Sequence, residues 1–247
     1  MNIQKFTGLV RRCVEDYDMI ADGEIVAVGV SGGKDSISLL CALANLRRYY
    51  PKRFELHAVT LDMGFAGVDF SPVDRLCSEI CVPFTLRRTD AAKVIFEDRC
   101  EKNPCSLCAK MRRGALHDLV KELGIRKLAL AHHFDDAVET FMMSLVYEGR
   151  IHCFQPVTYM DRSDVMQIRP MVYVGEDTVR KLIDRHGYPV VRNPCPMNGV
   201  SKREEVKTLL KTLSVDYPDL KSKVFGAMQR LPLKGWETEG AMRRPLP

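Results

Sequence analysis

Six consecutive residues, Ser31-Gly32-Gly33-Lys34-Asp35-Ser36, have the side chains and flexibility needed to bind phosphate. The two glycines let the backbone approach an anion closely, and the amides of a following helical turn would point at that anion. The lysine adds a positive charge and the serines add hydroxyl groups. An apolar run with strand composition, 25–30, precedes this stretch, and leucines at helical spacing follow it in 37–46. The sequence therefore predicts an anion site between a strand and a helix.

Two common phosphate-binding loops do not fit this stretch. A Walker A loop needs glycine at position 28 and Ser or Thr after the lysine, whereas the chain has Val28 and Asp35. The dinucleotide fingerprint G-x-G-x-x-G is also missing from the sequence. The stretch instead resembles the PP-loop of the ATP pyrophosphatases, which split ATP into AMP and pyrophosphate. An ordinary glycine turn that caps a helix is the alternative, and the strand-to-helix context favours nucleotide binding over it.

A Cys-x-x-Cys pair, Cys105 and Cys108, begins a predicted helix and is suited to a soft metal centre. A thioredoxin-type redox pair would follow the first strand of its own fold, and this pair does not. A structural zinc site needs four ligands, usually from a second pair, whereas an iron–sulfur cluster on three cysteines would leave one iron open. Counting ligands leaves zinc and cluster both open. Cys195, between two prolines, is the predicted third ligand, and Cys100 and Cys153 are its competitors.

Two adjacent carboxylates, Asp135 and Asp136, follow the fourth predicted strand, where open α/β sheets carry their active sites. They are predicted to hold Mg²⁺, which prefers carboxylates and phosphate oxygens, and capping of the helix is the alternative for one of them. His132 and His133, just before them, are interpreted as core or supporting groups. Asp62, at the end of the second predicted strand, is grouped with the nucleotide-binding residues.

The elements that would position these residues alternate between strand and helix. Strands are predicted at 25–30, 55–61, 84–88 and 127–131, and helices at 3–20, 37–46, 105–123 and 135–148, with a helix start at Ser71 and a loop over 98–104. This rhythm indicates an α/β fold with a mainly parallel sheet covered by helices on both faces. A hairpin or antiparallel edge pair is predicted from 154–159 and 165–168. Helices at 176–185, 202–213 and 220–231 follow it. The expected division is an α/β domain over 1–190 and a small helical C-terminal extension over 191–247, packed on the core.

Composition sets broader limits on the kind of protein. The 247 residues are 46% hydrophobic, which is ample for a core, and no apolar segment is long enough to span a bilayer. The N-terminal residues lack the apolar block of a signal peptide, so a cytoplasmic location is expected. Nine cysteines at irregular spacing favour thiols or metal ligands over disulfides. A net charge of +5 permits a nucleic-acid partner without requiring one.

Four motifs in one order resemble the tRNA 2-thiocytidine synthetase (TtcA) family of PP-loop enzymes. They are the SGGKDS stretch, C-S-L-C followed by 111–114, A-H-H-F-D-D-A-V-E-T at 131–140, and I-R-P-M-V-Y at 168–173. The resemblance runs from the first predicted strand to Cys195 and implies a HUP-type (PP-loop) fold, Mg-ATP, and a [4Fe-4S] cluster on Cys105, Cys108 and Cys195. The family usually has a second cysteine pair at the third ligand, whereas this chain has a single cysteine there, and the chain is short for the family.

The function implied by the resemblance is thiolation of cytidine 32 in the tRNA anticodon loop. ATP would adenylate the C2 oxygen, Lys34 and Mg²⁺ would neutralise the pyrophosphate, and Asp35 with Asp135 or Asp136 would hold the metal. The expected partners are tRNA and a sulfur donor such as a cysteine desulfurase, and a homodimer is compatible with the sequence. Thiolation of another tRNA position or of a small molecule, and a non-catalytic nucleotide-binding sensor, are the alternatives. Basic residues near the cysteine pair, including Arg112, are either an RNA contact or a solvated helix face.

Overall fold

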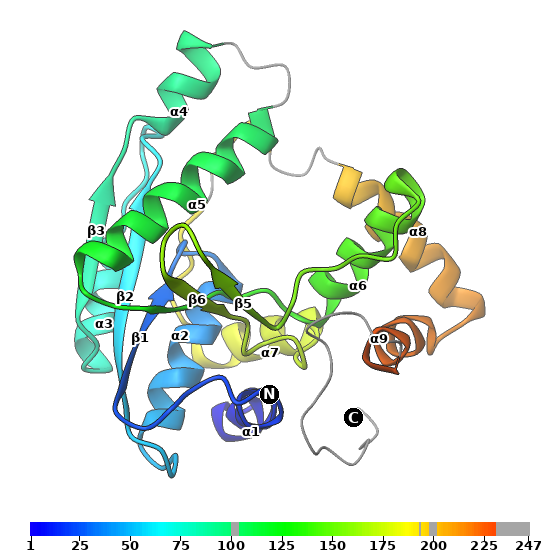
Figure 1. Ribbon diagram of the computed structural model, residues 1–247, viewed down its shortest axis with the longest axis horizontal. Helices are drawn as coiled ribbons and strands as arrows, with labels where there is room; N and C mark the ends of the chain where they lie inside the picture. Colours follow the sequence, from blue (N-terminus) through cyan, green and yellow to red (C-terminus); the bar gives the residue numbers. More distant parts are fainter. Residues whose placement is uncertain (100–103, 193, 198–201, 231–247) are drawn as a thin grey trace.

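The computed structural model describes residues 1–99, 104–192, 194–197 and 202–230. Its centre is a six-stranded sheet with the order β3-β2-β1-β4-β6-β5 (Figure 1). The strands are β1 (Glu24–Gly29), β2 (Phe54–Asp62), β3 (Phe84–Arg88), β4 (Lys127–Ala129), β5 (Val157–Met160) and β6 (Val165–Ile168). The predicted α/β class with a mainly parallel sheet is confirmed.

Parallel pairing brings the carboxyl ends of the central strands to one edge of the sheet. β1 pairs in parallel with both β2 and β4, β2 with β3, and β4 with β6. β5 runs antiparallel to β6 at the outer edge, as the predicted edge pair requires. Because β1 and β4 are neighbours, the segment after Gly29 and the segment after Ala129 emerge beside each other. This juxtaposition places the glycine-rich stretch next to the predicted carboxylates.

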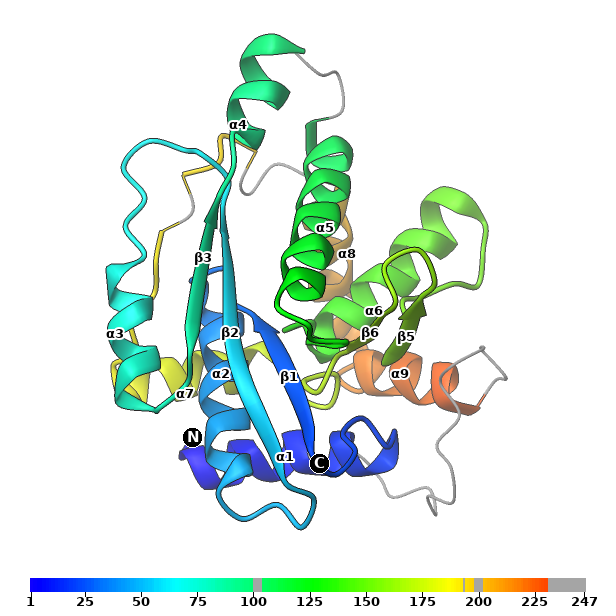
Figure 2. The same cartoon turned by 60° about the vertical axis from the view of Figure 1, so that its left-hand side comes forward.

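Helices cover both faces of the sheet (Figure 2). Helix α2 (Lys34–Arg47) packs on β1 and β2, and it also contacts α1 (Ile3–Asp16) and α7 (Glu176–His186). Helix α5 (Pro104–Glu122) lies on the opposite face against β2 and β6. The apolar layer under α5 is formed by Ala27, Val59, Leu119, Val120, Ile125, Leu128 and Val165. Helix α3 (Ser71–Glu79) begins with proline in its first turn, as predicted from the sequence.

Several boundaries differ from the sequence prediction. Helix α1 ends at Asp16 and not near residue 20, because Asp18 adopts a positive φ of 42° that a helix cannot continue through. Residues Ala91–Asp98 form one short helix, α4 followed by the π-helical segment η1, where no helix was predicted. A run this short carries too few periodic positions to distinguish it from a loop. Helix α6 (Phe134–Met143) continues into a second π-helical segment, η2 (Ser144–Glu148).

The C-terminal helices α8 (Lys202–Asp216) and α9 (Leu220–Arg230) pack on α6 and on each other. Val206, Leu210, Phe225 and Met228 are buried in the same apolar core as the main helices. These contacts agree with an extension packed on the core, and the boundary at 190/191 remains a prediction. The competitor cysteine Cys100 lies outside the described residues, as do residues 231–247 at the end of the predicted extension. No helix in the described ranges is long and apolar enough to cross a membrane.

Candidate active site

The glycine-rich stretch forms a compact loop between β1 and α2, held by its own serines. Ser36 Oγ accepts a hydrogen bond from the Ser31 amide at 3.1 Å and donates to the Gly33 carbonyl at 2.9 Å. The Gly33 amide donates to Ser31 Oγ at 3.3 Å. These bonds fix the loop so that the first amides of α2, which have no partner within the helix, lie at its mouth. This geometry suits the anion site expected from the sequence, and binding of an anion there remains a prediction.

Gly32 occupies a position that tolerates no side chain. Its φ of +81° lies in the left-handed region, and a Cβ added there would lie 2.7 Å from the Cβ of Val191. The Val191 amide donates a hydrogen bond to the Gly32 carbonyl at 2.9 Å. The segment that leads to Cys195 therefore packs directly on the loop, a contact that sequence analysis did not predict.

Lys34 lies between two carboxylates at the start of α2. Its Nζ is 2.9 Å from both carboxylate oxygens of Asp35 and 3.3 Å from Oε1 of Glu176. His133 lies on the other side of Asp35, with Nε2 3.7 Å from Oδ1. Since His133 Nδ1 accepts the Asp136 amide, Nε2 is the nitrogen that can carry the proton toward Asp35. Glu176 was not identified from the sequence, and its only signal was an acidic residue at a predicted helix start.

Asp135, predicted to hold Mg²⁺, has partners on both carboxylate oxygens. Oδ1 lies 2.6 Å from Lys221 Nζ of α9, and Oδ2 accepts the Glu176 amide at 2.7 Å. Burial raises the pKa of this carboxyl, but Lys221 and the Glu176 amide together lower it below its usual value. The side chain is buried and ties α6, α7 and α9 together. Its role in holding the metal remains a prediction.

Asp136, the second predicted carboxylate, caps its own helix. Its Oδ2 accepts the His133 amide at 3.0 Å while His133 Nδ1 accepts the Asp136 amide, a reciprocal capping box. Its Oδ1 lies 3.1 Å from Arg203 of α8. The capping alternative is therefore observed for this residue, and a metal role would require Arg203 to give way. Asp62 has a local role as well, since its Oδ1 accepts the Gly64 amide at 2.9 Å.

Cys105 and Cys108 lie in the first turns of α5, and Cys195 lies within electrostatic range of Cys108. Burial raises the pKa of the Cys108 thiol, Arg112 lowers it, and the charges of Cys195 and Cys105 raise it further, so both thiols are electrostatic neighbours of Cys108. Cys153 lies elsewhere, buried, with its thiol donating to the Ala137 carbonyl at 3.4 Å. Within the described ranges, no three Cys, His, Asp or Glu side chains are closed into a metal-binding arrangement. The thiols are suited to a soft metal centre in type and number.

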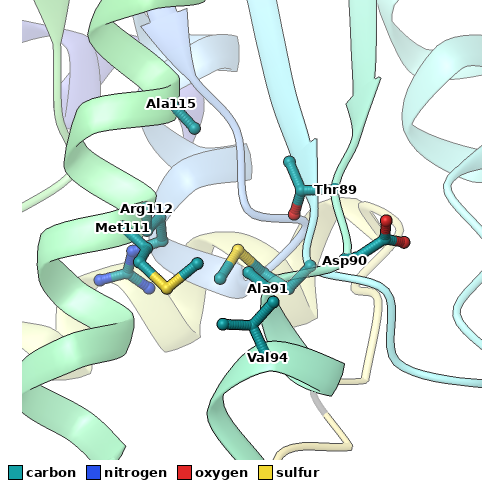
Figure 3. A pocket seen from close by; sticks show the side chains of 8 residues that line it. Thr89, Asp90, Ala91, Val94, Met111, Arg112 and Ala115 are labelled. Atoms are coloured by element: carbon teal, nitrogen blue, oxygen red, sulfur yellow. The ribbon is translucent and has the colours of Figure 1, made fainter. Parts of the chain in front are cut away.

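An apolar cavity of about 140 Å³ lies between α5 and the carboxyl ends of β2 and β3. In Figure 3, Thr89, Ala91 and Val94 face α5 across it, whereas the carboxylate of Asp90 points outward. Its remaining lining comes from Met63, after β2, and from Met111, Arg112 and Ala115 of α5. Positions 105, 108, 112 and 115 share one helix face, so the cavity and the thiols lie along the same side of α5.

His132 lies in the segment between β4 and α6, beside a buried cation. Its ring contacts the Phe154 ring in a tilted arrangement with centroids 5.0 Å apart, and the Arg169 guanidinium lies 5.0 Å from the centroid of the Phe154 ring. Among the described residues, His132 Nδ1 and Arg169 Nε have no hydrogen-bond partner although both atoms are buried. Burial lowers the pKa of His132 to about 3, with Arg169 adding to the effect. The histidine is therefore neutral in the folded protein, which agrees with its interpretation as a supporting group.

This arrangement predicts a specific pH dependence of stability. The folded-state pKa of His132 lies below its usual value of about 6.5, so protons favour the unfolded chain as the pH falls from there toward 3. One such group costs about 1.4 kcal/mol of unfolding free energy per pH unit inside that window. Urea unfolding at pH 6 and pH 5 should show a smaller loss for His132→Gln than for the wild type. The exposed His152→Gln serves as control, and identical losses in all three proteins would refute the assignment.

The fold and the loop at the end of β1 define an ATP-pyrophosphatase-type PP-loop protein, and comparison with known proteins agrees. The PP-loop domain family matches residues 4–210. A tRNA-cytidine(32) 2-sulfurtransferase of Syntrophotalea carbinolica is 39% identical, covering 92% of this chain and 87% of that protein. The protein of the same name from Geobacter sulfurreducens is 37% identical, covering 91% and 89%. The chain belongs to the tRNA-cytidine(32) 2-sulfurtransferase (TtcA) family of PP-loop transferases, as the sequence motifs indicated.

A solved structure supports the same fold. The U34-tRNA thiolase NcsA from Methanococcus maripaludis, solved with its [4Fe-4S] cluster, superimposes with a TM-score of 0.75 at 24% identity. The superposition covers 93% of this chain and 78% of that protein. The similarity therefore extends over nearly the whole chain.

Proposed function

We propose that this protein is an ATP-dependent tRNA thiolase that replaces the C2 oxygen of cytidine 32 with sulfur. Membership in a family whose relatives carry that name at 34–39% identity over most of their length is the observation that carries the proposal. The PP-loop supplies the ATP site and the three thiols supply a soft-metal site beside it. A tRNA substrate also agrees with the predicted cytoplasmic location.

The chemistry explains why ATP is needed. The C2 carbonyl of cytosine is a poor electrophile, because oxide is a poor leaving group. Transfer of AMP from ATP to that oxygen releases pyrophosphate and converts the oxygen into part of a good leaving group. A sulfur nucleophile then attacks C2, and AMP departs with the oxygen. The loop amides and Lys34 bind the pyrophosphate and offset the negative charge that develops as it leaves.

Two cofactors are implied by the family, and the residues fit them differently. Asp35 lies at the phosphate loop and offers the kind of carboxylate that Mg²⁺ commonly uses together with substrate phosphates. Asp35 would have to release Lys34, just as Asp135 and Asp136 would have to release Lys221 and Arg203, so metal binding by these carboxylates stays a prediction. Cys105, Cys108 and Cys195 fit a [4Fe-4S] cluster in donor type and number. When bound, such a cluster supplies an iron without a protein ligand that can carry the sulfur to be transferred.

The cavity beside α5 offers an apolar surface for a nucleobase on the side of the helix that carries Cys105 and Cys108. Two methionines, Met63 and Met111, line it, and thioethers pack favourably against planar rings. Arg112, at the cavity and next to Cys108, places a positive charge where an RNA phosphate can bind. A separate sulfur donor and a homodimer remain part of the proposal.

Nucleoside analysis of tRNA tests the proposal. We expect tRNA from a strain without this gene to lack 2-thiocytidine, and the purified protein to form AMP and pyrophosphate from ATP with that tRNA. Anaerobically purified protein should contain iron and sulfide and no stoichiometric zinc. Persistence of 2-thiocytidine in the deletion strain would refute the assignment to cytidine 32. Loss of another thiolated nucleoside would identify a different tRNA position, and ATP binding without turnover would favour a sensor.

A further inference from the structure

At the edge of the PP-loop, the Glu176 carboxylate forms ion pairs with basic side chains from three helices. Glu176 is the first residue of α7, and its amide donates to Asp135 Oδ2 at 2.7 Å. Its carboxylate lies 3.3 Å from Lys34 Nζ, 2.8 Å from Arg180 and 2.9 Å from Lys207 of α8. The side chain is only 15% exposed. The carboxylate is thus held in one place by contacts from α2, α7 and α8.

The Glu176 carboxylate is ionised in the folded protein. Burial alone would raise the pKa of Glu176, but hydrogen bonds from Arg180 and Lys207 and the charge of Lys34 lower it well below its usual value. A permanently ionised carboxylate near a phosphate site is unfavourable unless it serves a cation there. Of its three cations, Lys34 is the one that belongs to the phosphate-binding loop.

Lys34 needs an external restraint to work as a fixed charge. A lysine has a flexible four-carbon stem and three donors, so it loses considerable rotamer entropy when it is immobilised. Asp35 is its neighbour on the same helix and moves with it, whereas Glu176 comes from a different element. Contact with Glu176 draws Nζ toward α7, and a phosphate oxygen would take a donor of Lys34 that now faces Asp35. A charge placed in advance is most effective where negative charge develops during the reaction.

We propose that Glu176 is a positioning residue that holds Lys34 Nζ in place for cleavage of ATP at the PP-loop. The inference rests on the proposed function, because it requires ATP to be cleaved there. The competing explanation is structural, with Glu176 serving only to tie α7 to α8 through Lys207. The two explanations predict different kinetics, since a tie between helices affects folding but not the position of Lys34 Nζ.

The test measures AMP and pyrophosphate formation by the cluster-containing enzyme with tRNA. Glu176→Gln keeps the shape and removes the charge, so kcat should fall about 10- to 100-fold, the range expected for one charge-assisted contact. The KM for ATP should change less than about three-fold, because the contact acts on the departing pyrophosphate. Glu15→Gln is the matched control. It removes the charge of a helix carboxylate that pairs with Arg11 on α1 at 2.7 Å and, within the described residues, forms no ion pair with Lys34, so kcat should stay near the wild-type value.

A double mutant separates positioning from structure. If Glu176 acts through Lys34, the variant Glu176→Gln/Lys34→Met should be no slower than Lys34→Met alone. Two results would overturn the inference and leave the proposed function intact. One is a double variant whose loss of kcat equals the product of the two single-variant losses, and the other is an unchanged kcat in a folded Glu176→Gln protein. Wild-type enzyme that forms no AMP would overturn both.

Discussion

Replacing Cys195 with alanine should remove the iron–sulfur cluster and abolish thiolation. Its thiol is an electrostatic neighbour of Cys108, and Cys108 shares a helix turn with Cys105. A cluster that depends on three thiolates loses a direct ligand in this variant. Loss of a supporting residue around a metal ligand already costs about 10- to 100-fold in affinity, so loss of the ligand itself should cost more. Iron and sulfide in anaerobically purified Cys195→Ala protein should fall at least about ten-fold below the wild type.

Two other substitutions provide matched controls for this result. Cys153→Ala removes a buried thiol that bonds to the Ala137 carbonyl, away from the pair on α5, and should keep the iron. Cys100→Ala tests the remaining competitor among the predicted third ligands. If Cys195→Ala retains iron and one of the two control variants loses it, the cysteine replaced in that control is the third ligand. AMP formation by Cys195→Ala should persist at a reduced level, since the PP-loop residues are unchanged.

The second large effect is expected from Gly32→Ala. The added Cβ would lie 2.7 Å from the Cβ of Val191 on a backbone with φ of +81°. A left-handed conformation costs a non-glycine residue about 1–3 kcal/mol, and the contact with Val191 adds to that cost. The loop must shift, and the amides that bind phosphate shift with it. We expect about 3 kcal/mol lower stability in urea unfolding and at least a 100-fold lower rate of AMP formation.

Gly33→Ala is the control within the same loop. Its φ of −71° suits any residue, and the nearest atom to an added Cβ is Ser31 Oγ at 3.4 Å. As the N-cap of α2, alanine at this position should cost no more than about 1 kcal/mol. Equal destabilisation by the two substitutions would show that the strain assigned to Gly32 is wrong.

The sheet and the loop were predictable from local pattern, because each depends on residues close together in sequence. The apolar run 25–30, the glycines and the helix from Lys34 appear as expected. The edge pair β5 and β6 was recognisable from two short strands around Asp161–Asp164. The short helix Ala91–Asp98 was missed, because it is too brief to show a period.

The ion pairs of the site could not be read from the sequence. Asp135 and Asp136 are paired by Lys221 and Arg203, residues 86 and 67 positions away. Which lysine reaches which carboxylate depends on how α8 and α9 pack on α6, and that packing is set by apolar contacts without a sequence signature. The role of Glu176 could not be predicted for the same reason, because its contacts with Lys34 and Lys207 join three separate helices.

The hydrogen bond between Val191 and Gly32 limits how far apart the two reactive centres can be. Only four peptide units separate Val191 from Cys195, and an extended chain advances at most about 3.6 Å per residue. The Cα of Cys195 therefore lies within about 14 Å of the Cα of Val191, which is itself anchored to the phosphate loop. If ATP binds at the loop and Cys195 holds the cluster, as proposed, one short span of backbone fixes both centres, and an RNA base could reach both without a large movement.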